Sequence, residues 1–173
     1  ANSYYGGFCI REICRAVKSE NPAVRQEAVS EIAGWYIRTG EIGEGHVLVP
    51  VPQHGGKATY TLDICRMVAE RCGCTVADML RAVPHESLYE QKLHGRRNLY
   101  TGLYAAGHVT GKRIYLVDNV LATGKTMYDC MILMPEAVPF QEADLLGSCQ
   151  PFFLPPFQSV DEEGGKSSVF YSI

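Results

Sequence analysis

The expected fold is decided by the stretch Ile114-Tyr115-Leu116-Val117-Asp118-Asn119-Val120-Leu121-Ala122-Thr123-Gly124-Lys125-Thr126-Met127. Its first four residues form an apolar run that is typical of a strand buried on both faces. Asp118 follows at the end of this strand, and a short turn leads to a helix that is expected to begin near Lys125. A buried strand followed at once by a helix indicates a parallel α/β sheet.

The turn between this strand and this helix predicts an anion site. Ligands of parallel α/β sheets bind outside the carboxyl ends of the strands. The first N–H groups of a helix point toward an anion, and the helix dipole favours negative charge there. Thr123 and Thr126 add hydroxyl donors, and Gly124 allows the backbone to approach a phosphate closely. Lys125 adds a positive charge to the same turn.

The rest of the chain alternates between helical and strand patterns. Apolar spacing predicts helices over 8–18 and 22–38, the second capped by Asn21 and followed by Gly40. We expect further elements in this order: a strand at 47–52, a helix over 62–72, a strand at 76–83, a loop or hairpin at 84–98 and a strand at 143–149. This order predicts an α/β fold with a mostly parallel, twisted sheet flanked by helices.

The same pattern suggests three parts of the chain. Residues 1–45 form an N-terminal helical segment, residues 46–150 form the core, and residues 151–173 form a tail on or near the core. The tail differs in composition, since its prolines and the pair Gly164-Gly165 interrupt regular structure.

Composition narrows the class of protein. A chain of 173 residues with 46% hydrophobic and 20% charged residues suits one packed domain. It contains no apolar run of about 18 residues, and its N-terminus does not resemble a signal peptide, so neither a membrane span nor secretion is expected. The 7 cysteines include Cys72-Gly73-Cys74 but no C-x-x-C pair, so we expect no structural zinc and a reduced, cytoplasmic protein.

Charge is distributed unevenly along the chain. The net charge of −3 speaks against a generally basic protein, and direct binding of nucleic acid is not expected. Residues 81–113 contain six basic and two acidic residues, a local charge of +4, whereas residues 135–173 have a local charge of −5. An anionic ligand is therefore expected near the basic middle of the chain.

Two kinds of phosphate loop end in a similar way. The Walker A motif requires G-x-x-x-x-G-K-[ST], and Gly124-Lys125-Thr126 supplies its last three positions. Its first glycine would fall at Asn119, and the motif has no place for Asp118. The nucleoside-triphosphatase interpretation is therefore the weaker one.

The stretch Val117 to Thr126 resembles the ribose-5-phosphate motif of type I phosphoribosyltransferases, which bind phosphoribosyl pyrophosphate (PRPP). The resemblance implies that the 5′-phosphate is held by Ala122, Thr123, Gly124, Lys125 and Thr126. It further implies that Asp118 and Asn119 contact the ribose hydroxyls, with Asp118 also near the Mg²⁺ that accompanies PRPP. The family usually has a second acid where this chain has Asn119, which can form hydrogen bonds but has no charge.

Other segments agree with this resemblance. The family places a pyrophosphate loop after its first buried strand, and here that position is taken by Gln53, His54, Gly55, Gly56 and Lys57. The basic loop over 87–98, with Lys92 and Arg96, stands where the family has a mobile loop that closes over PRPP. More narrowly, the chain is similar to the competence protein F (ComF) group, without the zinc ribbon often found there; the shared features are Tyr4-Tyr5-Gly6, Val49-Pro50-Val51-Pro52, Gln91, Arg96-x-Asn98 and Gly111-Lys112.

The resemblance implies transfer of a phosphoribosyl group from PRPP to a nitrogen nucleophile, with release of pyrophosphate. Ala122 replaces the aspartate of 6-oxopurine enzymes, which argues against hypoxanthine or guanine as the acceptor. Two alternatives remain: a PRPP- or nucleotide-binding regulator without transferase activity, or an accessory protein of DNA uptake. Asn119 and the lack of an evident general base favour the regulator. A homodimer is expected because family members often form one.

Overall fold

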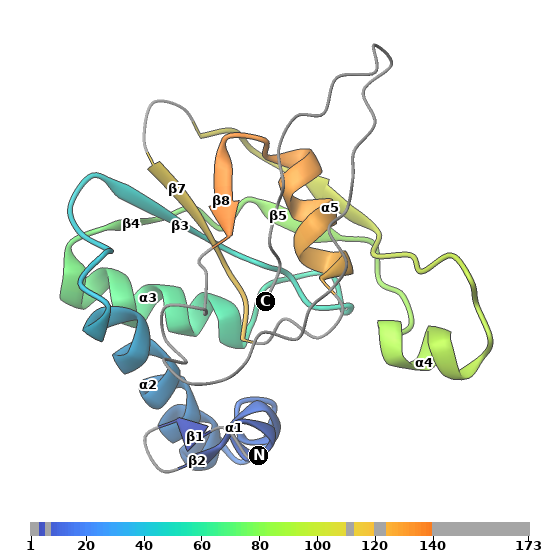
Figure 1. The fold of residues 1–173 in the computed structure, drawn as a ribbon, viewed down its shortest axis with the longest axis horizontal. Helices are drawn as coiled ribbons and strands as arrows, with labels where there is room; N and C mark the ends of the chain where they lie inside the picture. Colours follow the sequence, from blue (N-terminus) through green and yellow to red (C-terminus); the bar gives the residue numbers. More distant parts are fainter. Residues whose placement is uncertain (1–3, 6–7, 110–112, 120–123, 140–173) are drawn as a thin grey trace. The chain divides into compact units, whose positions relative to one another are not determined.

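The computed structural model describes residues 4–5, 8–109, 113–119 and 124–139, and a parallel sheet lies at its centre (Figure 1). The sheet contains β3 (His46–Pro50), β4 (Thr75–Val76), β7 (Arg113–Val117) and β8 (Ala137–Pro139), in the order β4-β3-β7-β8. All three neighbouring pairs are parallel. The predicted α/β class and the parallel sheet are thus confirmed.

Two crossover helices connect these strands in opposite directions. Helix α3 (Tyr60–Cys72) leads from β3 outward to β4, and helix α5 (Lys125–Leu133) precedes β8 on the other side of β7. Because such crossovers are right-handed, helices that lead in opposite directions lie on opposite faces of the sheet. Figure 1 shows this arrangement, with α3 on one side of β3 and β7 and α5 on the other.

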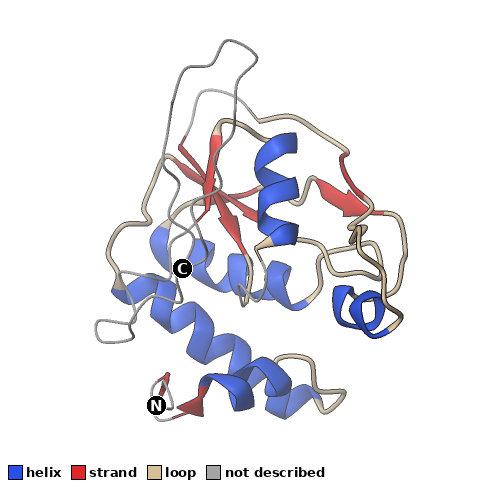
Figure 2. Cartoon of the chain, turned by 45° about the vertical axis from the view of Figure 1, so that its right-hand side comes forward, coloured by secondary structure: helices blue, strands red, loops and turns tan. Residues whose placement is uncertain are grey.

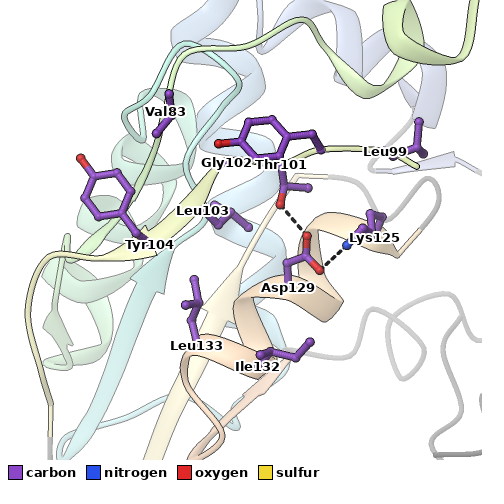
Figure 3. A pocket seen from close by; sticks show the side chains of 11 residues that line it. Val83, Leu99, Thr101, Gly102, Leu103, Tyr104, Lys125, Asp129, Ile132 and Leu133 are labelled. Carbon is purple, nitrogen blue, oxygen red and sulfur yellow. Dashed lines mark hydrogen bonds and ion pairs between the residues drawn. The ribbon is translucent and has the colours of Figure 1, made fainter. Parts of the chain in front are cut away.

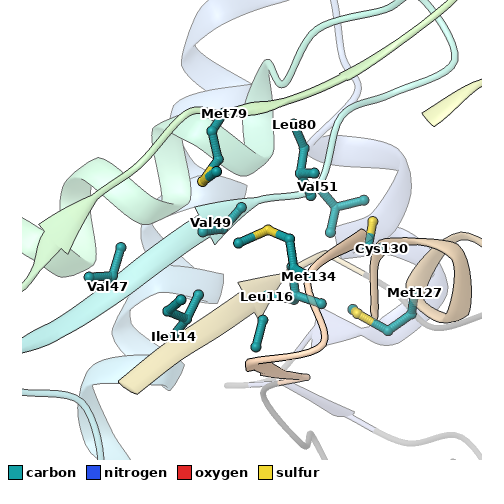
Figure 4. Packing of buried hydrophobic residues seen from close by; sticks show 11 residues of the cluster. Val47, Val49, Val51, Met79, Leu80, Ile114, Leu116, Met127, Cys130 and Met134 are labelled. Carbon is teal, nitrogen blue, oxygen red and sulfur yellow. The ribbon is translucent and has the colours of Figure 1, made fainter. Parts of the chain in front are cut away.

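The core on the α5 face consists of alternate residues of the two central strands (Figure 4). Val47 and Val49 of β3 and Ile114 and Leu116 of β7 point to this face, as the period of two along a strand requires. They pack against three residues of α5 and the segment after it, namely Met127, Cys130 and Met134. Fully burying each aliphatic side chain contributes about 1.5–3 kcal/mol, so this cluster fixes α5 on the sheet.

The N-terminal segment packs on the opposite face through α3. It contains a two-stranded ribbon of β1 (Tyr4–Tyr5) and β2 (Phe8–Cys9), followed by α1 (Ile10–Ala16) and α2 (Pro22–Arg38). As expected, the Asn21 side chain caps α2 by accepting a hydrogen bond from the Ala23 N–H group. The predicted apolar face is wrong only at its start, because Val24 is 40% exposed and Ala28, Val29 and Ile32 are buried instead.

A separate hairpin corrects two expectations. The strand predicted over 76–83 is in fact two strands, because β5 (Leu80–Ala82) leaves the parallel sheet and pairs antiparallel with β6 (Leu103–Ala105). The predicted loop contains the helix α4 (Leu88–Leu93), which begins with a capping box between Ser87 and Glu90. The residues from β5 to β6, called the lid below, form one excursion from the sheet that carries α4 at its far end (Figure 2).

The strand after α5 comes earlier than predicted. β8 occupies Ala137–Pro139, and Met134 ends α5 with its N–H group bonded to the Cys130 carbonyl. The strand expected at 143–149 and the tail at 151–173 lie outside the described residues.

Candidate functional site

The carboxyl ends of β3 and β7 form a topological switch point. The two strands are neighbours, with Pro50 paired to Val117, and the chain leaves them toward helices on opposite faces. The Val51 N–H group extends the pairing by donating to the Val117 carbonyl at 3.0 Å. Such a point leaves a crevice outside the strand ends, which is the usual ligand site of open parallel sheets. The sequence-predicted residues at 53–57 and 118–126 leave the sheet at this point.

Asp118 is the first residue after β7. Its side chain is half-buried, and its Oδ1 accepts a hydrogen bond from the Asn119 N–H group at 2.8 Å. Tyr36 of α2 donates its hydroxyl to the Asp118 carbonyl at 2.9 Å, which fixes the backbone at the strand end. Burial raises the pKa of the Asp118 carboxyl to about 6, and the Asn119 N–H group and Lys18 act in the opposite direction. The carboxylate is therefore poised to change charge in mildly acidic solution.

Asn119 is buried beside Asp118 and is only 6% exposed. Its Nδ2 has no hydrogen-bond partner among the residues that the structure describes. A buried polar group without a partner costs about 1–3 kcal/mol, so such groups are rare and mark strain or a ligand site. Both sequence-predicted ribose contacts thus lie together at the strand end, and one of them offers an unused donor.

The predicted phosphate turn is described from Gly124 onward, whereas Ala122 and Thr123 lie outside the described residues. Gly124 precedes α5 with φ 70°, a left-handed conformation that favours glycine. Lys125 is the first residue of α5, and its Nζ forms an ion pair with Asp129 Oδ1 at 2.5 Å. Thr126 follows, half-buried. The helix start, Lys125 and Thr126 are therefore arranged as an anion site requires.

The 53–57 turn is held by its first residue. Gln53 Nε2 donates to the Val51 carbonyl and to Thr61 Oγ1, both at 3.1 Å, while its Oε1 accepts from the N–H and hydroxyl of Thr59 at 2.7 Å. The structure thus gives Gln53 a positioning role within the turn. His54, Gly55 and Lys57 are exposed beyond it.

Gly56 brings the lid against this turn. Its φ is 106°, and a Cβ at this position would lie 2.9 Å from the Ala82 carbonyl oxygen. The Ala82 N–H group donates to the Gly56 carbonyl at 2.9 Å, and the His85 N–H group donates to the His54 carbonyl at 3.0 Å. The imidazole of His85 lies 6.4 Å from that of His54. The base of the lid is therefore attached directly to the 53–57 turn.

Within the lid, Gln91 joins α4 to the returning chain. It is 1% exposed, its Nε2 donates to the carbonyls of Glu86 and Tyr100, and its Oε1 accepts from the Tyr100 N–H group. The predicted pyrophosphate residues of the lid are exposed: Lys92 is on α4, and Arg96 forms an ion pair with Glu86 at 3.1 Å. The described contacts bring the lid base, but neither Lys92 nor Arg96, against the 53–57 turn.

A cavity of about 450 Å³ lies between the lid and α5 (Figure 3). Asp129 stands on its wall with a side chain 17% exposed, and its Oδ2 accepts from the buried Thr101 hydroxyl at 2.5 Å. Its Oδ1 carries the ion pair with Lys125. Thr101 and Asp129 escape sequence reasoning because Thr101 is distant in the chain. The spacing of Lys125 and Asp129, four residues apart on one helix, is the signal that could have indicated the ion pair.

The acidic groups of the site are few. Over the described ranges, no group of three or more His, Cys, Asp or Glu side chains is arranged to hold a metal ion. Mg²⁺ is usually bound through substrate phosphates with one or two carboxylates, and Asp118 is the carboxylate at the strand end.

Comparison with protein-family models, with curated proteins and with solved structures gave no match for this chain. Among the described residues, no helix has the length and apolar character needed to cross a membrane.

Proposed function

We propose that this protein binds the magnesium complex of PRPP and transfers its phosphoribosyl group to a nitrogen nucleophile. The observation that carries the proposal is the switch point between β3 and β7. Because Pro50 pairs with Val117, the 53–57 turn and the segment from Asp118 to Thr126 leave the sheet at neighbouring positions of one edge. A ligand with a phosphate at one end and a pyrophosphate at the other matches two anion-binding turns at one edge.

The reaction requires groups that stabilise charge rather than a covalent intermediate. The bond from ribose C1 to the pyrophosphate oxygen breaks, and its electron pair leaves with pyrophosphate. The acceptor nitrogen supplies the electron pair of the new C1–N bond and releases its proton to solvent. Positive charge grows on the ribose in between, and the Asp118 carboxylate at the strand end would stabilise it. With a pKa of about 6, Asp118 is mostly ionised at neutral pH.

The remaining groups bind and enclose the substrate in this proposal. The start of α5, with Lys125 and Thr126, takes the 5′-phosphate, and the Asn119 amide donates to a ribose hydroxyl. The exposed N–H groups around Gly55, together with Lys57, take the pyrophosphate. The lid is attached to the same turn through Ala82 and His85, so a change at the turn reaches the lid directly. Closure of a lid excludes water, which would otherwise intercept the ribose cation.

Calorimetric titration of the full chain with magnesium PRPP tests the proposal. We expect binding in the parent protein and a loss of about tenfold or more in Asp118→Ala, since tenfold corresponds to about 1.4 kcal/mol. Tyr89→Ala is the matched control, because Tyr89 is 71% exposed on α4 and should leave binding unchanged. Absence of binding at millimolar PRPP would refute the proposal. Equal affinity in Asp118→Ala would refute the ribose assignment.

A regulator that binds PRPP without transferring it is the second candidate. The observation in its favour is Asn119, which is neutral where a second carboxylate would add to the negative charge around the ribose. Release of pyrophosphate, measured over a panel of nitrogen bases and amines, separates the two functions. Release that depends on one acceptor supports the transferase. Tight binding of PRPP without release over the panel supports the regulator.

A further inference from the structure

The cavity beside α5 combines apolar walls with one polar end (Figure 3). Aliphatic side chains from both sides line it, with Val83 and Leu103 on the lid and Ile132 and Leu133 on α5. Tyr100 and Tyr104 add two aromatic rings from the lid. Its volume of about 450 Å³ falls within the range of about 300–1,000 Å³ that is usual for sites of small organic ligands.

The polar end is close to neutral. Asp129 carries a negative charge that the ammonium group of Lys125 balances at 2.5 Å, and Thr101 occupies its other oxygen. Each carboxylate oxygen can accept a further hydrogen bond, because a carboxylate offers about four acceptor positions. The cavity therefore favours an uncharged ligand that donates an N–H group, over a free cation or a phosphate.

The cavity is connected to both predicted anion sites. Lys125 belongs to its wall and is also the first residue of the helix at the phosphate turn. Tyr100 belongs to its wall too, and its ring lies 5.6 Å from that of His85, whose N–H group is bonded to His54 in the 53–57 turn. A molecule in this cavity would thus contact residues that are linked to both ends of a bound PRPP.

We infer that this cavity is the acceptor site, and that it takes a neutral, planar nitrogen heterocycle whose ring N–H donates to Asp129. The apolar walls and tyrosine rings then cover the two faces of the ring, and Thr101 and Lys125 hold the Asp129 carboxylate in place. The word acceptor rests on the proposed transferase function, whereas binding of the heterocycle does not.

Calorimetry with adenine and with uracil, each on the full chain, tests the inference. The titrations are run alone and with ribose 5-phosphate plus magnesium pyrophosphate, which occupy the two turns without reacting. Ile132→Trp fills the cavity from a position that is 61% exposed and therefore tolerates a large side chain. Asp129→Asn changes the polar end with little change in shape. Tyr89→Trp, on the exposed side of α4, is the control.

We expect at least one heterocycle to bind the parent and the control equally, and both cavity variants to weaken binding by about tenfold or more, or about 1.4 kcal/mol. Failure of both heterocycles under both conditions, or unchanged affinity in Ile132→Trp, overturns the inference. Magnesium PRPP is titrated into the same proteins. Binding of PRPP without a cavity-dependent heterocycle refutes the acceptor site alone. A cavity-dependent heterocycle without PRPP binding refutes the transferase and leaves the cavity as a heterocycle site.

Discussion

Asn119 lies directly after β7, with its side-chain amide buried and without a partner among the described residues. We predict that Asn119→Leu, which has a similar shape and no polar atoms, separates stability from binding. The free protein should keep its stability or gain about 1 kcal/mol, because an unsatisfied buried group is removed. Affinity for magnesium PRPP should fall, because a donor to the ribose is lost. Thermal unfolding and calorimetry measure the two quantities.

A structural role of Asn119 would give the opposite pattern. In that case Asn119→Leu would lower the unfolding temperature and leave the affinity of the remaining folded protein unchanged. Asn119→Ser serves as the intermediate variant, since its hydroxyl still donates but reaches less far.

The raised pKa of Asp118 predicts how binding depends on pH. Hydroxyl groups of a ribose donate to a carboxylate, so they favour its ionised form. Because the free protein has a pKa of about 6 at this group, Asp118 is protonated below that pH and must lose its proton to bind. Affinity for magnesium PRPP should therefore rise between pH 5 and 7 and then level off.

Phosphate groups also titrate near pH 6, so the parent protein needs a reference. Asp118→Asn supplies it, because the variant retains the phosphate dependence and lacks the carboxyl group. Calorimetry at matched ionic strength should show a steeper rise for the parent than for Asp118→Asn. Parallel curves would mean that Asp118 does not contact the ligand in its ionised form.

At the scale of elements, the lid depends on one buried side chain. Gln91 connects α4 to the chain that returns to β6 by three hydrogen bonds to Glu86 and Tyr100. We predict that Gln91→Ala releases α4, so that amide hydrogens over 86–100 exchange faster while those of β3 and β7 keep their protection. The effect arises because the backbone groups of Glu86 and Tyr100 lose their partners.

The functional consequence of this change is measured on the same variant. Affinity for magnesium PRPP should decrease if the lid closes over the ligand. Tyr89→Ala, also on α4 but exposed, should change neither exchange nor affinity. Faster exchange with unchanged affinity would show that the lid plays no part in binding PRPP.

The elements that sequence patterns predicted well are those with strong local signals. Asn21-Pro22 marks the start of α2, and the continuous apolar runs at 47–51 and 114–117 mark β3 and β7. The lid was harder, because β5 and β6 are separated by about twenty residues and pair only through the tertiary fold. Helix α4 was missed although Ser87 and Glu90 form a recognisable capping box, since its six residues show no apolar period.

The candidate site divides in the same way. Asp118, Asn119 and Lys125 lie where the motif placed them, because strand, turn and helix follow each other in the chain. Contacts between distant segments could not be read from the sequence: Thr101 with Asp129, and Tyr36 with the Asp118 carbonyl. Gln53 has the predicted place, but only its hydrogen bonds reveal that it holds the turn.

At the scale of the whole molecule, the proposed ligand joins parts that the free protein connects by few contacts. PRPP would contact the start of α5, the end of β7 and the 53–57 turn, and the lid is attached to that turn. A ligand that binds only the folded state stabilises it by about 2.7 kcal/mol at about 100 times its Kd. For a chain of this size that corresponds to a rise of about 5–10 °C in Tm.

This stabilisation should require all parts of the ligand together. We predict that magnesium PRPP raises Tm by more than magnesium pyrophosphate or ribose 5-phosphate at equal concentration, because linking two groups makes the second contact intramolecular. Thermal unfolding with each ligand, and with Mg²⁺ alone, measures this. An equal rise with pyrophosphate and with PRPP would mean that the 53–57 turn acts as an isolated anion site. The end of β7 would then take no part in binding, and Asp118 and Asn119 would need another explanation.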